Sequence, residues 1–223
     1  MNSFSSRKAF SAAMTDTLRD LLKQRALTTG QKVTLSTGRE SNFYLNCKAV
    51  TLSSDGASLI ADAFLDKLTE LPEPVTAVGG RTLGADPIVG AMMMRALERG
   101  QRLEGFYVRD KKKTHGTMEL IANAPPTGTR VVIVDDVVTT GGSVLEAVDA
   151  AEAIGCKVVG VIALMDRQQE GGAENIRARV PHYFALYTRQ DFPEIGEAEK
   201  WDTKTSAQPS AIQEDSTSIT SGR

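Results

Sequence analysis

The sequence of 223 residues predicts an α/β protein with a mostly parallel central sheet flanked by helices. Three observations support this fold class. From residue 75 onward, short β-branched runs alternate with helical patterns, which is the rhythm of βαβ units. The run 131–134 is continuously apolar, as in a strand covered on both faces. Polar and small residues follow the predicted strands, at the edge where open α/β sheets bind their ligands.

The N-terminal segment departs from this rhythm. Apolar residues at helical spacing predict an amphipathic helix over about residues 6–26. Residues 41–50 have strand character, and Ser53, Ser54 and Asp55 are candidate N-caps for a helix that follows.

The βαβ region is predicted element by element. A helix is expected over 84–98, because Pro87 lies near its first turn and Gly100 follows its end. A second helix, 143–154, ends before Gly155 and connects two parallel strands by a right-handed crossover. The predicted strands lie at 75–78, 105–108, 117–122, 131–134, 158–164 and 182–187.

Composition argues against several classes of function. The net charge of −2 provides no basic field for nucleic acid, and aromatic residues are few. There is no apolar run of the ~20 residues that a membrane span needs, and no signal-peptide core. Cys47 and Cys156 lack metal-ligand spacing, and His115 and His182 cannot form a histidine-rich metal site. We therefore expect a cytoplasmic protein with reduced cysteines and neither a membrane nor a nucleic-acid partner.

Length and composition also predict the domain organisation. Residues 1–202 are expected to form one domain, because the chain suits a single α/β domain with additions. Residues 203–223 are rich in Ser, Thr and Gln with almost no large apolar side chains, so we expect a disordered C-terminal tail. The chain has no internal repeat.

The segment 131–154 carries the clearest functional signal. Asp135 and Asp136 follow the apolar run, and a loop of small residues, 139–143, then leads into a helix. Backbone N–H groups at such a helix start bind anions, while carboxylates accept hydrogen bonds from hydroxyls. The combination fits a ribose phosphate. The alternative is that these residues only turn a strand into a helix, as many βα loops do.

Two further segments follow predicted strands. Residues 109–116 hold Arg109, three lysines and His115, and a cationic loop of this kind can neutralise a polyphosphate leaving group. The alternative is a solvated hairpin. Arg167 comes after the strand 158–164 and can hold a carboxylate in a planar contact, or else form a surface ion pair.

Together, the segments 36–44, 109–116, 134–143 and 165–168 resemble the orotate phosphoribosyltransferases, a family of type I phosphoribosyltransferases. The resemblance implies the type I phosphoribosyltransferase fold, with an N-terminal helix and strand hood at about 1–50 and a flexible basic loop. It implies that orotate and phosphoribosyl diphosphate react, with Mg²⁺, to give orotidine 5′-phosphate and diphosphate in de novo pyrimidine (UMP) synthesis. Because the loop typically serves the neighbouring subunit in this family, the resemblance also implies a homodimer.

The resemblance assigns roles to individual residues. Asp135 and Asp136 would hold the ribose hydroxyls, the loop 139–143 the 5′-phosphate, and Arg167 the orotate. We expect no direct protein ligand for Mg²⁺, since this ion keeps most of its waters. The implied catalytic residues are Lys113, His115, Asp135 and Asp136. The implied substrate-binding residues are Arg109, Lys111, Lys113, His115, Asp135, Asp136, Val137, Val138, Thr139, Thr140, Gly141, Gly142, Ser143 and Arg167.

Three positions depart from the pattern of many members. Asp110 stands where a Lys often follows the loop arginine, so Lys111 is expected to replace it. Gly84 and Ser36 also stand where many members have a Lys, although some share the Leu-Gly-Ala-Asp-Pro form around Gly84. We therefore expect fewer lysines on the diphosphate.

Two other functions remain open from the sequence. A purine-type phosphoribosyltransferase takes a neutral base, so Arg167 is the residue that separates it from an orotate enzyme. A non-catalytic regulator that binds phosphoribosyl diphosphate needs a basic nucleic-acid surface and often lacks the catalytic loop. The acidic chain and the presence of Lys113 and His115 disfavour the regulator.

Overall fold

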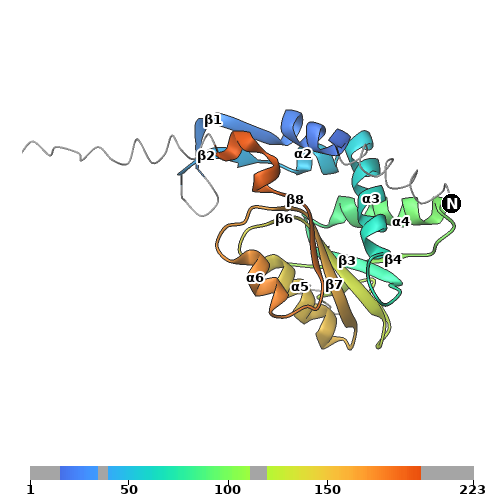
Figure 1. Cartoon of the computed structure of the whole chain (residues 1–223). Helices are drawn as coiled ribbons and strands as arrows, with labels where there is room; N and C mark the ends of the chain where they lie inside the picture. Colours follow the sequence, from blue (N-terminus) through green and yellow to red (C-terminus); the bar gives the residue numbers. More distant parts are fainter. Residues whose placement is uncertain (1–15, 35–39, 111–119, 197–223) are drawn as a thin grey trace, which may run out of the picture.

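The computed structural model describes residues 16–34, 40–110 and 120–196 (Figure 1). The predicted site residues Lys111, Lys113 and His115 lie outside these ranges, as do Ser36 and the tail 203–223. No helix in the described ranges has the length and apolar character to cross a membrane.

A six-stranded, mostly parallel sheet forms the centre of the protein, as predicted. Its strand order is β5-β4-β3-β6-β7-β8, and β5 alone runs antiparallel to its neighbour. The strands are β3 (Ala77–Arg81), β4 (Glu104–Val108), β5 (Ile121–Ala122), β6 (Arg130–Val138), β7 (Lys157–Asp166) and β8 (Tyr183–Thr188). From β3 the sheet grows in one direction through β4 and β5, and from β6 it grows in the opposite direction through β7 and β8. Ligands of open α/β sheets bind at such a switch point, so we expect the site at the carboxyl ends of β3 and β6.

Helices cover both faces of the sheet (Figure 1). On β6, Val132 and Val134 pack into the core with α3 (Ser54–Leu68) and α4 (Asp86–Glu98). The alternate residues Val131 and Ile133 pack on the other face with α5 (Gly142–Ala153) and α6 (Gly172–Arg177). This alternation explains why the run 131–134 is apolar throughout.

The N-terminal hood shares the core of α3 and α4. It contains helical residues 16–21, η1 (Leu22–Ala26), the antiparallel pair β1 (Leu27–Thr34) and β2 (Glu40–Leu45), and α2 (Lys48–Thr51). Leu18, Leu22 and Phe43 are buried in the same cluster as Phe64 of α3. Figure 1 draws the hood above the sheet, with α5 and α6 on the opposite side.

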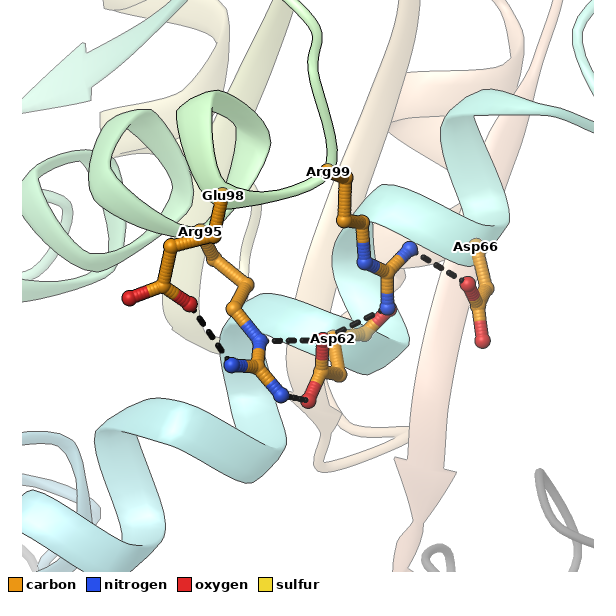
Figure 2. A network of polar contacts seen from close by, with 5 residues as sticks. All are labelled: Asp62, Asp66, Arg95, Glu98 and Arg99. Atoms are coloured by element: carbon orange, nitrogen blue, oxygen red, sulfur yellow. Dashed lines mark hydrogen bonds and ion pairs between the residues drawn. The ribbon is translucent and has the colours of Figure 1, made fainter.

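An ion-pair network fastens α3 to α4 (Figure 2). Asp62 is buried, and its carboxylate accepts two hydrogen bonds of 2.7 Å from Arg95 and one of 2.6 Å from Arg99. Asp66 and Glu98 complete the network at its exposed ends. Burial opposes ionisation of Asp62, but the two guanidinium groups outweigh it and lower the pKa of this carboxyl.

The structure corrects several strand boundaries, including that of β3, which was expected over 75–78 and spans Ala77–Arg81. The strand expected over 41–50 ends at Leu45, and the chain then turns into α2, because Asn46 N–H bonds back to Ala26 O. The strand expected over 131–134 continues to Val138, because its pairing with β7 extends as far as Asp166. Asp135 and Asp136 therefore lie within β6 and not after it. The helix cap at Ser53 is confirmed, since its Oγ accepts from Gly56 N–H.

Candidate active site

The carboxylate pair lies near the carboxyl end of β6. Asp135 and Asp136 are only 6% and 8% exposed. Asp136 N–H donates to Asp135 Oδ1 at 2.9 Å, which fixes the first carboxylate against the strand. Burial, together with the charge of Asp136, raises the pKa of Asp135 to about 7. Such a pair provides buried acceptors for the hydroxyls of a bound sugar.

The turn after β3 passes directly against this pair. A Cβ on Gly84 would lie 2.5 Å from Asp135 Oδ1 and 2.7 Å from Asp136 Oδ1, closer than any ordinary contact. Glycine is therefore required by the approach of the two segments. This explains in physical terms why a lysine does not fit at position 84 in this arrangement.

The loop between β6 and α5 is shaped for an anion. Gly141 caps α5 with a φ of 79°, a left-handed conformation that glycine adopts without strain. Gly142 N–H bonds to Thr140 Oγ1 at 3.2 Å, and Asn175 Nδ2 donates to Thr140 O at 3.1 Å. The first turn of α5 thus presents backbone N–H groups and the positive end of the helix dipole at the sheet edge.

The remaining predicted site residues of this segment are divided between the end of β6 and the start of α5. Val137 and Val138 are still paired with β7, and Val138 is buried, so their side chains belong to the sheet. Thr139 is half-buried, whereas Gly142 and Ser143 are exposed at the helix start. Gly172 lies so close that its Cβ would be 2.3 Å from Thr139 O, so α6 supports the loop from behind.

Arg167 lies beside the hood at the end of β7. Its guanidinium carbon is 5.0 Å from the centroid of the Phe43 ring, and the backbone N–H of Arg167 donates to Val138 O at 3.0 Å. The buried Asp166 orders this turn, because it accepts from Gln168 N–H at 2.7 Å and from Tyr183 Oη at 3.1 Å. The side chain is thereby held at the same edge as the carboxylate pair.

The base of the predicted basic loop lies at this edge as well. Arg109 N–H bonds to Leu120 O at 3.0 Å, which closes the loop between β4 and β5. Asp110 accepts from Arg81 Nε at 2.9 Å, and Arg81 also pairs with Glu146 of α5. Asp110 therefore anchors the loop to β3. The positions of Lys111, Lys113 and His115 stay predictions.

Sequence reasoning missed two residues of this site. Lys48 of α2 places its Nζ 3.1 Å from Asp136 Oδ2, and no motif points to it, because an isolated lysine in a strand-like stretch carries no signal. Phe43 lies in the polar and aromatic stretch 37–46, whose glycine and aromatic residues were the only available hint.

Asp135 and Asp136 are the acidic residues of this site that a metal ion could approach. Within the described ranges, no group of three or more His, Cys, Asp or Glu residues is arranged to hold a metal ion. Two neighbouring carboxylates without a third ligand suit Mg²⁺, which keeps its waters and binds substrate oxygens. Cys47 and Cys156 are free and buried, and burial raises the pKa of both thiols.

Comparisons with known proteins agree with this geometry. The phosphoribosyl transferase domain family matches residues 90–187. Orotate phosphoribosyltransferases of Streptomyces avermitilis and Sorangium cellulosum are 42% and 41% identical to the chain, over 74% and 77% of its length and 89% of theirs. The Mycobacterium tuberculosis orotate phosphoribosyltransferase in complex with phosphoribosyl diphosphate superposes with a TM-score of 0.66 at 34% identity, covering 82% of this chain and 99% of that one. The chain belongs to the orotate phosphoribosyltransferase family.

Proposed function

We propose that the protein transfers the 5-phosphoribosyl group from phosphoribosyl diphosphate to orotate, forming orotidine 5′-phosphate and diphosphate in UMP biosynthesis. The observation that carries the proposal is the meeting of three groups at one sheet edge: the buried carboxylate pair, the N-terminus of α5 and Arg167. The similarity to named orotate phosphoribosyltransferases over 89% of their length supports the same activity.

The sugar phosphate is proposed to bind along β6 and α5. Asp135 and Asp136 accept hydrogen bonds from the ribose 2′- and 3′-hydroxyls, while the N–H groups of residues 139–143 hold the 5′-phosphate. Charge develops on the ribose ring as the bond to diphosphate breaks, and nearby carboxylates stabilise this oxocarbenium-like state more than the ground state.

The leaving group is proposed to bind under the basic loop. Arg109, Lys111, Lys113 and His115 contact the diphosphate, and their positive charges stabilise it as it departs. Mg²⁺, bound to substrate oxygens, supplies further positive charge to the diphosphate. The Arg81–Asp110 contact supports this assignment, since it fixes the first residues of the loop at the site.

Orotate is proposed to bind at Arg167. Orotate carries a carboxylate, and a guanidinium forms planar, paired hydrogen bonds with such a group. Packing over Phe43 restricts the guanidinium plane, so less conformational freedom is lost when the base binds.

We further propose a cytoplasmic homodimer whose basic loops serve the neighbouring subunit. Three large apolar side chains of the turn before α4 and of α4 itself support a subunit contact: Leu83, Met94 and Leu97 are 73%, 65% and 65% exposed. The two free, buried cysteines suit a reducing compartment.

A panel of bases tests the activity. The protein is incubated with phosphoribosyl diphosphate, Mg²⁺ and orotate, uracil, hypoxanthine or adenine, and diphosphate release is followed. We expect diphosphate release with orotate and with none of the other three bases. Release with hypoxanthine or adenine but not orotate would establish a purine-type enzyme, and binding of phosphoribosyl diphosphate without release would indicate a regulator.

A further inference from the structure

The hood brings one lysine to the carboxylate pair. Lys48 Nζ lies 3.1 Å from Asp136 Oδ2, although 88 residues separate the two. The lysine side chain is 47% exposed, whereas that of Asp136 is only 11% exposed. The contact therefore joins α2 of the hood to the carboxyl-terminal part of β6.

Two adjacent buried carboxylates require a nearby positive charge. Like charges at this separation oppose each other, which is one reason why the pKa of Asp135 is raised to about 7. The charge of Lys48 opposes this rise in the pKa of Asp135. Burial lowers the pKa of Lys48, but the charges of Asp136 and Asp135 outweigh this effect and raise it, so the ammonium stays protonated.

Gly84 leaves no room for a side chain of its own beside the pair. There the backbone of Gly84 approaches both carboxylates, and even a Cβ would fall within 2.5 Å of Asp135 Oδ1. The hood supplies an ion pair to these carboxylates through Lys48.

We propose that Lys48 is a positioning residue for phosphoribosyl diphosphate, whose ammonium offsets the charge of the carboxylate pair and orients the Asp136 carboxylate for the ribose hydroxyls. This inference rests on the proposed function, because it takes a ribose as the group that Asp136 binds. A carboxylate oxygen accepts two hydrogen bonds, so Oδ2 can accept from Lys48 and from a hydroxyl together. The sugar then meets an acceptor whose charge and orientation are already set.

Two substitutions of Lys48 and one control test the inference. Lys48→Met removes the charge and keeps the length of the side chain, whereas Lys48→Arg keeps the charge. Lys23→Met is the matched control, because Lys23 also lies in the hood and pairs with Glu194 instead of a site acid. Binding of phosphoribosyl diphosphate with Mg²⁺, without orotate, is measured by calorimetry, and thermal unfolding checks that each variant is folded.

We expect Lys48→Met to weaken phosphoribosyl diphosphate binding about tenfold, the size of one charge-assisted hydrogen bond. The KM for orotate should change by less than about twofold, because Lys48 pairs with Asp136, whereas the proposed base site is Arg167 over Phe43. Lys48→Arg should recover most of the affinity, and Lys23→Met should bind like the wild type.

The pH profile gives a second readout. In the described ranges, the titratable and charged groups around the pair are Lys48 of α2, Cys47 at the N-cap of α2, Arg167 after β7, and Tyr183 of β8. The charge of Lys48 lowers the pKa of Asp135, so without the ammonium this pKa should rise and activity should be lost at higher pH as the solution is acidified. We expect the acid limb of kcat/KM for phosphoribosyl diphosphate to move up by about one pH unit in Lys48→Met.

Three outcomes would overturn the inference. They are wild-type affinity in Lys48→Met, an affinity loss that Lys48→Arg does not recover, and an unmoved acid limb. A wild-type protein that does not consume orotate contradicts the proposed function instead, and the calorimetric comparison still decides the role of Lys48, since it contains no orotate.

Discussion

At the scale of single residues, the site depends on a contact that only glycine allows. Gly84→Ala would place a methyl group 2.5 Å from Asp135 Oδ1, so the carboxylate pair or the turn must shift. Such overpacking costs about 1–3 kcal/mol, and we expect the KM for phosphoribosyl diphosphate to rise by about tenfold or more. Steady-state kinetics with varied phosphoribosyl diphosphate measures the effect.

Gly90→Ala is the matched control for this substitution. Gly90 lies inside α4, and a Cβ there has no heavy atom within 4 Å. The activity of Gly90→Ala should equal that of the wild type, and the alanine should stabilise α4 by about 0.5–1 kcal/mol. Equal kinetics of Gly84→Ala and Gly90→Ala would show that the contact at Gly84 has no role in binding.

Arg167 is predicted to select the base. Arg167→Ala removes the guanidinium over Phe43 and should raise the KM for orotate about tenfold to a hundredfold, the loss of a charged hydrogen-bonding partner. The affinity for phosphoribosyl diphosphate should stay within about twofold, because Arg167 is proposed to contact only the base. Equal weakening for both substrates would contradict the assignment, and calorimetry with each substrate separates the two results.

At the scale of elements, the α3–α4 contact contributes stability through a buried charge. Asp62→Ala leaves Arg95 and Arg99 without their shared carboxylate (Figure 2). Because both arginine side chains are partly exposed, we expect a loss of about 1–3 kcal/mol, below that of a fully buried pair. Asp149→Ala is the control, since its pair with Arg179 is exposed, and it should cost less than about 0.5 kcal/mol in urea unfolding.

The stabilisation that Asp62 provides should depend on pH. The folded-state pKa of Asp62 is lowered, so its stabilisation is complete above the unfolded value of about 3.9 and is lost as the pH falls through the folded-state pKa. The difference in unfolding free energy between wild type and Asp62→Ala should therefore be constant from neutral pH to about pH 5 and shrink below pH ~4. A difference that grew in acid would contradict this origin.

At the scale of the whole molecule, the sheet was more predictable than the hood. Apolar runs predicted the position of each strand from β3 onward, and caps and spacing predicted the helices, because these signals are local in sequence. The bounds predicted for β3 and β6 were nevertheless wrong. The hood strands were less clear: the stretch 41–50 contains both β2 and α2, and the turn between them depends on a backbone contact with Ala26. Distant contacts of this kind leave no periodic signal.

The residues of the site also differ in how well the sequence predicted them. Asp135, Asp136 and the loop 139–143 are adjacent in sequence and were predicted together, although their strand boundary was wrong. Lys48, Phe43 and Gly84 reach the site from other elements, and no local motif predicts their contacts there. Only the fold shows that a lysine of the hood meets a carboxylate of the sheet.

Mixed dimers test whether two chains build each site. Lys113→Ala and Asp136→Ala homodimers should each lose about 10²-fold in kcat, since each removes one charged contact of the reaction. If the loop serves the neighbouring subunit, a mixed dimer contains one site with both Asp136 and Lys113 intact and one site lacking both. Unfolding and refolding an equal mixture should make half of the dimers mixed, and therefore recover about a quarter of wild-type activity. If each loop serves its own subunit, every site lacks one residue and no activity returns; refolded single variants are the control.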